Sequence, residues 1–149
     1  MFDGRVGKVA AIVLREGRSG TEVLVFDHPP ENGASMVQVP AGTVEPGEAP
    51  EVAVVRELME ETGVQGELIA LAGVRDEEWE GELRRRWIYL MRPLEPTLDA
   101  WDYYCDCGAP IVCHWLSFED AEIASVQQPW IEVARAWHKG RLSTSLGDS

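Results

Sequence analysis

The stretch Gly42–Val64, GTVEPGEAPEVAVVRELMEETGV, decides how the rest of this 149-residue chain is understood. It opens with turn-forming glycines and prolines and continues as a helix-forming run from Pro50 to Thr62. Proline suits the first turn of a helix because its missing N–H would have no partner there, and glycine commonly follows the last turn. The sequence therefore predicts a loop, a helix and a closing residue, Gly63.

Three glutamates of this predicted helix share one face: Glu57, Glu60 and Glu61. At about 100° per residue, Glu57 lies about 40° from Glu61 and about 60° from Glu60. Clustered like charges destabilise a helix by about a few tenths of a kcal/mol per pair, and a bound hard cation removes that penalty. A solvated acidic helix face has the same pattern, so other residues must decide. The residues expected to pack on a sheet from the opposite side are Val52, Val55 and Met59.

The residues around the glutamates favour a metal platform. Gly42 follows a predicted strand, from which a backbone carbonyl is able to reach the same cation. Glu48 stands at the entrance of the helix, and Arg56 immediately precedes the first glutamate. A guanidinium holds a carboxylate through two parallel hydrogen bonds, so Arg56 is placed to orient an acidic group.

Outside this segment, hydrophobic runs and turn residues predict further strands and one more helix. Strands are expected at residues 8–15, 21–27, 36–40, 67–75, 84–92 and 111–118, with loops at 28–33, 41–47 and 93–110. A second amphipathic helix is expected at residues 129–139, and a mobile tail after about residue 140. The combination predicts a single α/β or α+β domain over residues 1–149.

The overall charge is strongly acidic, with 26 acidic and 13 basic residues and a net charge of −13. We expect no duplex nucleic acid partner, because phosphate backbones bind to basic faces. No apolar run reaches the roughly 18 residues of a membrane span, and the N-terminus has no signal pattern, so a cytoplasmic protein without a membrane partner is expected. An anionic phosphate substrate would need bound cations to offset the repulsion.

A second candidate metal cluster consists of Cys105, Cys107, Cys113 and His114. Its spacing lacks the second matched pair that is typical of zinc sites, and small residues near a strand are the simpler interpretation. An odd number of cysteines also argues against a disulfide framework. Whether these residues bind anything stays open.

Residues 42–64 resemble the Nudix box, which reads Gly, five residues, Glu, seven residues, Arg-Glu, an aliphatic, any residue, Glu-Glu, any residue, Gly and an aliphatic. All nine constrained positions are met within 23 residues: Gly42, Glu48, Arg56, Glu57, Leu58, Glu60, Glu61, Gly63 and Val64. The resemblance extends over about residues 5–140, including QVPAG before the box and HWLSFED near the last strand.

The resemblance implies a mixed β-sheet sandwiched between α-helices. It implies hydrolysis of a pyrophosphate bond in a nucleoside diphosphate linked to another group, such as a sugar nucleotide, an ADP-ribose-like compound or a (d)NTP. The alternative is a catalytically silent module that senses nucleotides. The partner is then a small-molecule nucleotide, and a homodimer is compatible with the resemblance.

The resemblance also assigns roles to residues of the box. Glu57, Glu60 and Glu61 are implied to be catalytic and to bind Mg²⁺ or Mn²⁺, with the Gly42 carbonyl as a further ligand. The implied roles of Glu48 and Arg56 are to orient the site as an ion pair that fixes the loop to the helix.

Candidates beyond the box rest on weaker signals. Trp79 is able to stack on a nucleobase, although packing is the ordinary role of a tryptophan. Arg85 belongs to a basic cluster at residues 84–86, where one face of a strand is able to meet phosphates and a solvated strand edge is the simpler interpretation. Glu57 is the first candidate for the general base. Acids of the predicted hairpin are the alternatives: Glu77, Glu78 and Glu80.

Overall fold

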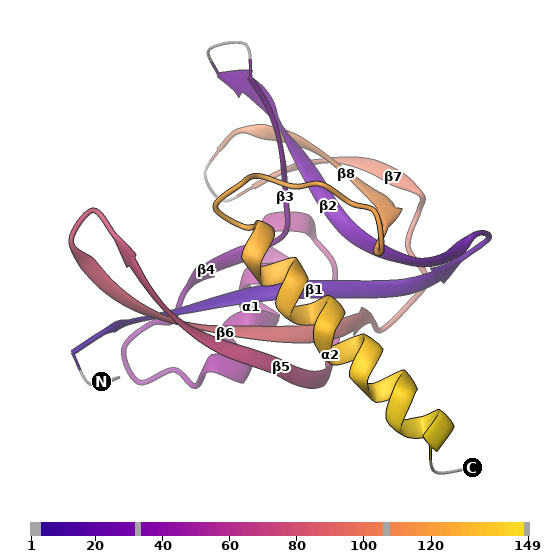
Figure 1. Ribbon diagram of the computed structural model, residues 1–149. Coiled ribbons are helices and arrows are strands. Elements are labelled where there is room, and N and C mark those ends of the chain that lie inside the picture. The colour runs from indigo at the N-terminus through magenta and orange to yellow at the C-terminus, as the bar shows by residue number, and fades with distance from the viewer. Residues whose placement is uncertain (1–3, 32–33, 106–107, 148–149) are drawn as a thin grey trace.

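The computed structural model describes residues 4–31, 34–105 and 108–147 (Figure 1). Its elements, in chain order, are β1 (Val6–Gly17), β2 (Gly20–Glu31), β3 (Ala34–Gln38), β4 (Ala41–Thr43), α1 (Pro50–Thr62), β5 (Gly66–Trp79), β6 (Glu82–Pro93), β7 (Ala100–Tyr104), β8 (Pro110–Ser117) and α2 (Gln128–Gly147). No helix among these residues is both long enough and apolar enough to cross a membrane.

The strands form a mixed sheet in the order β5-β6-β1-β2-β8-β7, with β4 paired to β1 and β3 paired to β2. β1 runs parallel to β6, from Val6 opposite Arg84 to Val13 opposite Met91. The other pairings between described strands are antiparallel. The mixed sheet expected from the sequence is therefore confirmed.

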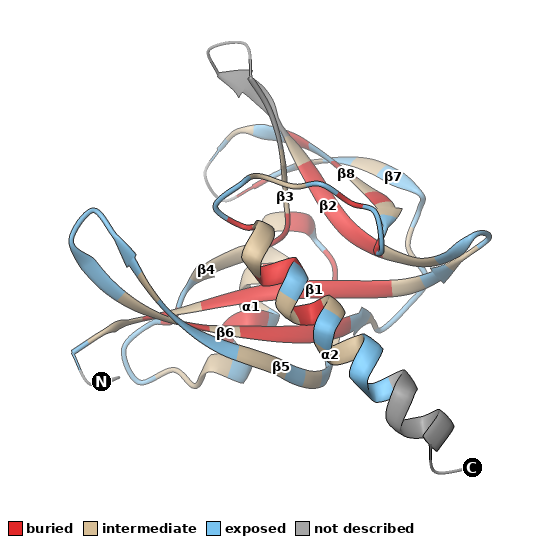
Figure 2. Cartoon of the chain, in the orientation of Figure 1, coloured by how far each residue is buried: buried red, intermediate tan, exposed pale blue. Residues whose placement is uncertain are grey.

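The two helices cover opposite faces of the sheet around β1 (Figure 1). Val9, Ala11 and Val13 of β1 belong to the apolar core beneath α1. The alternate residues Ala10 and Ile12 belong to the core beneath α2. Because β1 is buried on both faces, its sequence is a nearly continuous apolar run (Figure 2).

Several predicted boundaries were wrong. The loop expected at 41–47 contains the three-residue strand β4, and the loop expected at 93–110 contains β7. β2 continues to Glu31 and α2 continues to Gly147, beyond the predicted ends of both elements. β4 pairs with β1, which is distant in the sequence, so its three residues carry little local signal. β7 has only five residues and pairs with the next strand along the chain, β8.

The predicted packing face of α1 was also wrong. Val52 is 56% exposed and Val55 is 36% exposed, whereas Val54 and Leu58 are fully buried. Met59 is partly exposed. The buried stripe of α1 thus lies beside the glutamate face instead of opposite it. This orientation arises because the helix has apolar residues on two sides, and the sheet covers the side that also faces β4.

The basic cluster at residues 84–86 does not lie on a sheet edge, because β6 is enclosed between β5 and β1. Arg86 is only 4% exposed. Its guanidinium lies 3.8 Å from the ring centroid of Trp130 on α2 and donates a 3.0 Å hydrogen bond to Glu77 on β5. The solvated-edge interpretation is therefore wrong for Arg86.

Candidate active site

The carboxylate of Glu57 lies directly against the backbone of β4. A Cβ atom added to Gly42 would fall 2.1 Å from the Cδ atom of Glu57, which is far inside van der Waals contact. Glycine is therefore required at this position if the carboxylate is to occupy its place. The side chain of Glu57 is only 12% exposed, so β4 and α1 together hold it in a restricted space.

Glu61 contacts the neighbouring residue of the same strand. Its Oε2 atom accepts a 3.2 Å hydrogen bond from the backbone N–H of Ala41. Residues four apart on a helix are neighbours, so Glu57 and Glu61 reach successive residues of β4 from successive turns of α1. Two of the three glutamates predicted to act together are thus brought to one short strand.

Arg56 joins the loop that precedes the helix to the helix itself. Its Nε and Nη2 atoms each donate a 2.8 Å hydrogen bond to the carboxylate of Glu48, and Nη2 also donates to the carbonyl of Thr43 at 3.0 Å. The side-chain hydrogen bond from Arg56 lowers the pKa of Glu48 to about 2. The ion pair expected between Glu48 and Arg56 is therefore present in a two-pronged form.

The same guanidinium also serves the glutamate face. The Nη1 atom of Arg56 donates to Glu57 at 3.0 Å and to Glu60 at 3.2 Å. Hydrogen bonding to Glu48, followed by the contacts with the other two glutamates, raises the pKa of Arg56. One cation thus offsets the mutual repulsion of three carboxylates, and Glu60, at 35% side-chain exposure, is the most open of the three.

The donor set fits a hard divalent cation. Glu57, Glu60 and Glu61 offer carboxylate oxygens, which are the ligands that Mg²⁺ and Mn²⁺ prefer. The space left by the missing side chain of Gly42 is what allows one of these carboxylates to lie against the strand. Among the residues that the structure describes, no three acidic, histidine or cysteine side chains already surround a common point.

The weaker candidates lie apart from this carboxylate group. Trp79 is 45% exposed beside the turn between β5 and β6, with the guanidinium of Arg84 5.9 Å from its ring centroid. Arg85 donates a 2.8 Å hydrogen bond to Asp76 across the same strand pair. Glu77 accepts hydrogen bonds from Arg86 and from Trp130 on the α2 side, which commits both of its oxygens to packing that helix.

The cysteine cluster receives little support as a metal site. Burial, followed by the charge of Glu61, raises the pKa of the Cys113 thiol to about 12, so a thiolate is disfavoured at neutral pH. The Nε2 atom of His114 lies 3.2 Å from a carboxylate oxygen of Asp27. Cys107 lies outside the described residues.

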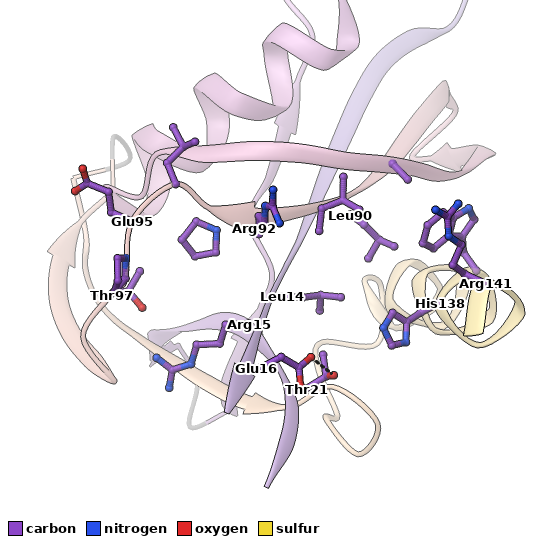
Figure 3. Close-up of a pocket in the computed structure, with 16 residues that line it drawn as sticks. Leu14, Arg15, Glu16, Thr21, Leu90, Arg92, Glu95, Thr97, His138 and Arg141 are labelled. Atoms are coloured by element: carbon purple, nitrogen blue, oxygen red, sulfur yellow. Dashed lines mark hydrogen bonds between the residues drawn. The ribbon is translucent and has the colours of Figure 1, made fainter. Parts of the chain in front are cut away.

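A cavity of about 630 Å³ lies at the far end of β1, between the sheet and α2. Figure 3 shows Leu14 and Leu90 along it, with His138 and Arg141 of α2 at one end. No residue of the 42–64 segment lines it. The cavity is therefore separate from the carboxylate face of α1.

Lys8 lies beside this site and was not predicted from the sequence. Its Nζ atom donates a 2.6 Å hydrogen bond to the hydroxyl of Thr43, the residue that follows Gly42. These two residues face one another in the pairing of β1 with β4. Only the pairing of β1 with β4 places Lys8 opposite Thr43. Because the sequence did not predict the strand β4, it did not predict this contact either.

Known proteins share both the sequence pattern and the fold. The ADP-sugar pyrophosphatase of Mus musculus is 48% identical over 46 residues, which are 31% of this chain and 21% of that protein. The diphosphoinositol polyphosphate phosphohydrolase 3-alpha of Mus musculus is 35% identical over 83 residues, 56% of this chain and 48% of that protein. The fold is similar to that of a C. elegans Ap4A hydrolase, with a TM-score of 0.68 and 20% identity, over 91% of this chain and 98% of that one.

The chain spans no more than about half the length of these two mouse relatives. The sequence profile of the NUDIX domain, in contrast, matches residues 5–141, which is most of the chain. That match includes the strands on both sides of the 42–64 segment as well as the segment itself. The chain therefore belongs to the NUDIX domain family.

Proposed function

We propose that this protein is a metal-dependent hydrolase that cleaves the pyrophosphate bond of a nucleoside diphosphate linked to another group. The observation that carries this proposal is the convergence of box residues on β4. The carboxylate of Glu57 occupies the space over Gly42, and Glu61 accepts a hydrogen bond from Ala41. A merely solvated acidic helix would need neither a glycine opposite Glu57 nor an arginine that bonds two of its carboxylates and Glu48.

Glu57, Glu60 and Glu61 would hold Mg²⁺ or Mn²⁺, with the carbonyl of Gly42 as a further ligand. In such sites a divalent cation neutralises the charge of the diphosphate and lowers the pKa of a bound water. Arg56 neutralises the same carboxylates in the structure, through its contacts with Glu57 and Glu60. A bound cation would share that role with the guanidinium, which stays anchored by Glu48.

The chain's own residues would then position the reaction. Glu57 is the first candidate for the general base, because β4 and Arg56 fix its carboxylate in one place. Glu77 is a weaker candidate than the sequence suggested, because its oxygens are bonded to Arg86 and Trp130. The clasp between Arg56 and Glu48 would keep the loop and the helix at the spacing that the reaction requires.

The names of the relatives agree on the type of bond that is cut, but they name different substrates. An ADP-sugar, a diphosphoinositol polyphosphate and Ap4A differ widely, yet each contains a phosphoanhydride. The proposal is therefore specific about the anhydride bond and broad about the attached group, which includes sugar nucleotides, ADP-ribose-like compounds and (d)NTPs.

A substrate panel tests the proposal. ADP-ribose, sugar nucleotides, dinucleoside polyphosphates, diphosphoinositol polyphosphates and (d)NTPs are incubated with the protein and Mg²⁺ or Mn²⁺, and products are identified by mass. We expect phosphomonoester products from at least one class, and none when EDTA is present. A compound that raises Tm in the presence of the cation but is never cleaved would instead support the silent nucleotide-sensing module.

A further inference from the structure

Lys8 is placed beside the box by the register of three strands. It faces Thr43 of β4 on one side and Arg86 of β6 on the other. Its ammonium donates to the hydroxyl of Thr43 at 2.6 Å. This hydrogen bond holds the charge one residue away from Gly42, over which the carboxylate of Glu57 lies.

The ammonium of Lys8 forms no ion pair with a described carboxylate, although the charges of Glu82 and Glu57 act on it through space. The neighbouring cations do have such partners: Arg84 donates to Glu82 at 2.8 Å, and Arg86 donates to Glu77 at 3.0 Å. An ammonium has three N–H donors, and the hydroxyl of Thr43 occupies one of them. Two N–H donors of Lys8 therefore remain for water or for an anionic ligand.

The surroundings of Lys8 favour binding of an anion. Burial, followed by the charges of Arg84 and Arg86, lowers the pKa of Lys8. Partial burial and the two arginines therefore disfavour the ammonium charge, and the charges of Glu82 and Glu57 offset this effect only in part. An anionic ligand would reverse that penalty, because an opposite charge at close range favours the ammonium form.

Lys8 and Glu57 approach the same edge of the sheet from its two faces. The missing side chain of Gly42 faces Glu57, and alternation along β4 turns Thr43, with the ammonium bound to it, toward the other face. β4 is only three residues long and pairs with β1 on one side. We propose that the ammonium of Lys8 binds the diphosphate of the substrate at this edge, across β4 from the carboxylates.

This proposal rests on the proposed function for the identity of the ligand, but one test does not require turnover. The chain has two lysines, Lys8 and Lys139, so Lys139 serves as an internal control. Limited acylation with an amine-reactive ester is compared with and without methylenediphosphonate and Mg²⁺, and each site is quantified by peptide mass spectrometry. We expect the analogue to suppress labelling of Lys8 and to leave labelling of Lys139 unchanged. Unchanged labelling of Lys8 at the highest analogue concentration would overturn the proposal.

Variants separate substrate binding from a structural role. Lys8→Met should raise KM for the best substrate by about 10- to 100-fold, because a hydrogen bond to a charged group is lost. Lys8→Arg should recover most of that loss, and Lys139→Met should have no effect. Thr43→Val removes the hydrogen bond and keeps the ammonium, so it reports what the contact contributes to Tm.

Two outcomes of these measurements lead to different conclusions. A Lys8→Met variant with unchanged KM and a Tm lowered as in Thr43→Val would show that Lys8 only braces β4, and the proposal would fall. Wild-type protein that cleaves nothing in the substrate panel, yet shows protection of Lys8 by the analogue, would overturn the proposed function and keep the diphosphate site.

Discussion

Gly42 contributes to the site through the side chain that it lacks. Its backbone does not adopt a positive φ, so conformational freedom is not the reason for the glycine. The reason is the carboxylate of Glu57, whose Cδ atom would lie 2.1 Å from an added Cβ. A glycine in a sequence pattern is needed either for a positive φ or for the absence of a Cβ atom, and the structure shows that Gly42 is needed for the second reason.

We expect Gly42→Ala to keep the fold and to weaken cation binding, because the methyl group displaces the carboxylate of Glu57. Isothermal titration with Mn²⁺ measures the affinity, and circular dichroism checks the fold. Gly140→Ala is the control, since a Cβ at Gly140 meets nothing within 4 Å. Equal Mn²⁺ affinity in both variants and the wild type would show that Glu57 is not a ligand in this position.

The contribution of Glu48 to the stability of the protein should depend on pH. Its pKa is about 2 in the folded protein, compared with an ordinary value of 4.5, because Arg56 donates to its ionised form. A lowered folded-state pKa means that the stabilisation is complete above about pH 4.5 and is lost as the pH falls toward 2. The difference in Tm between wild type and Glu48→Gln should therefore shrink over this interval. A constant difference would contradict the assignment.

At the scale of the element, α1 is a helix with two apolar sides and one acidic side. The sheet packs on the side that contains Val54 and Leu58, both of which are fully buried, whereas Val55 is 36% exposed. Glu57 and Glu61 lie next to this buried stripe and therefore reach β4. The packing of α1 on the sheet therefore also determines where the carboxylates of Glu57 and Glu61 lie.

This arrangement predicts unequal effects of two truncations in α1. Leu58→Ala should lower the free energy of unfolding by about 2–5 kcal/mol, the usual range for a buried leucine. Val55→Ala should change it by less than about 0.5 kcal/mol, as expected of a surface position. Urea denaturation measures both. A larger loss for Val55→Ala would restore the packing face expected from the sequence.

The parts of the molecule that were predictable are those with local signals. Pro50 and Gly63 mark the two ends of α1, and the box residues follow from their fixed spacing. β7 is a strand of only five residues that pairs with the next strand, β8, whereas β4 was missed because its three residues pair with the distant strand β1. Lys8 was missed for the same reason, since its contact with Thr43 spans 35 residues of sequence.

At the scale of the whole molecule, a charged network attaches α2 to the sheet. Trp130 of α2 donates a 2.6 Å hydrogen bond to Glu77, which also pairs with the buried Arg86. The guanidinium of Arg86 donates to the backbone carbonyl of Val9 at 2.9 Å. Three strands and α2 are thereby joined on the side of the sheet that α1 does not cover.

We expect Glu77→Ala to destabilise the protein by about 3–5 kcal/mol, because it leaves the charge of Arg86 buried without a partner. Glu78→Ala, at an exposed neighbouring position, should change the free energy of unfolding by less than about 0.5 kcal/mol. Urea denaturation of both variants gives the comparison. Similar stability of the two variants would show that Arg86 finds other compensation in the fold.

The carboxylate face of α1 is the part of the molecule on which the proposed function depends, and Glu60 on this face is more exposed than Glu57. The decisive measurement is the initial rate of hydrolysis, with Mg²⁺, of the best substrate by wild type, Glu60→Gln and the exposed control Glu119→Gln. Glu60→Gln should lose at least about 100-fold, the scale of one key electrostatic group, and Glu119→Gln should match the wild type. A folded Glu60→Gln variant within about tenfold of the wild-type rate would contradict the metal platform, because that loss is too small for a cation ligand.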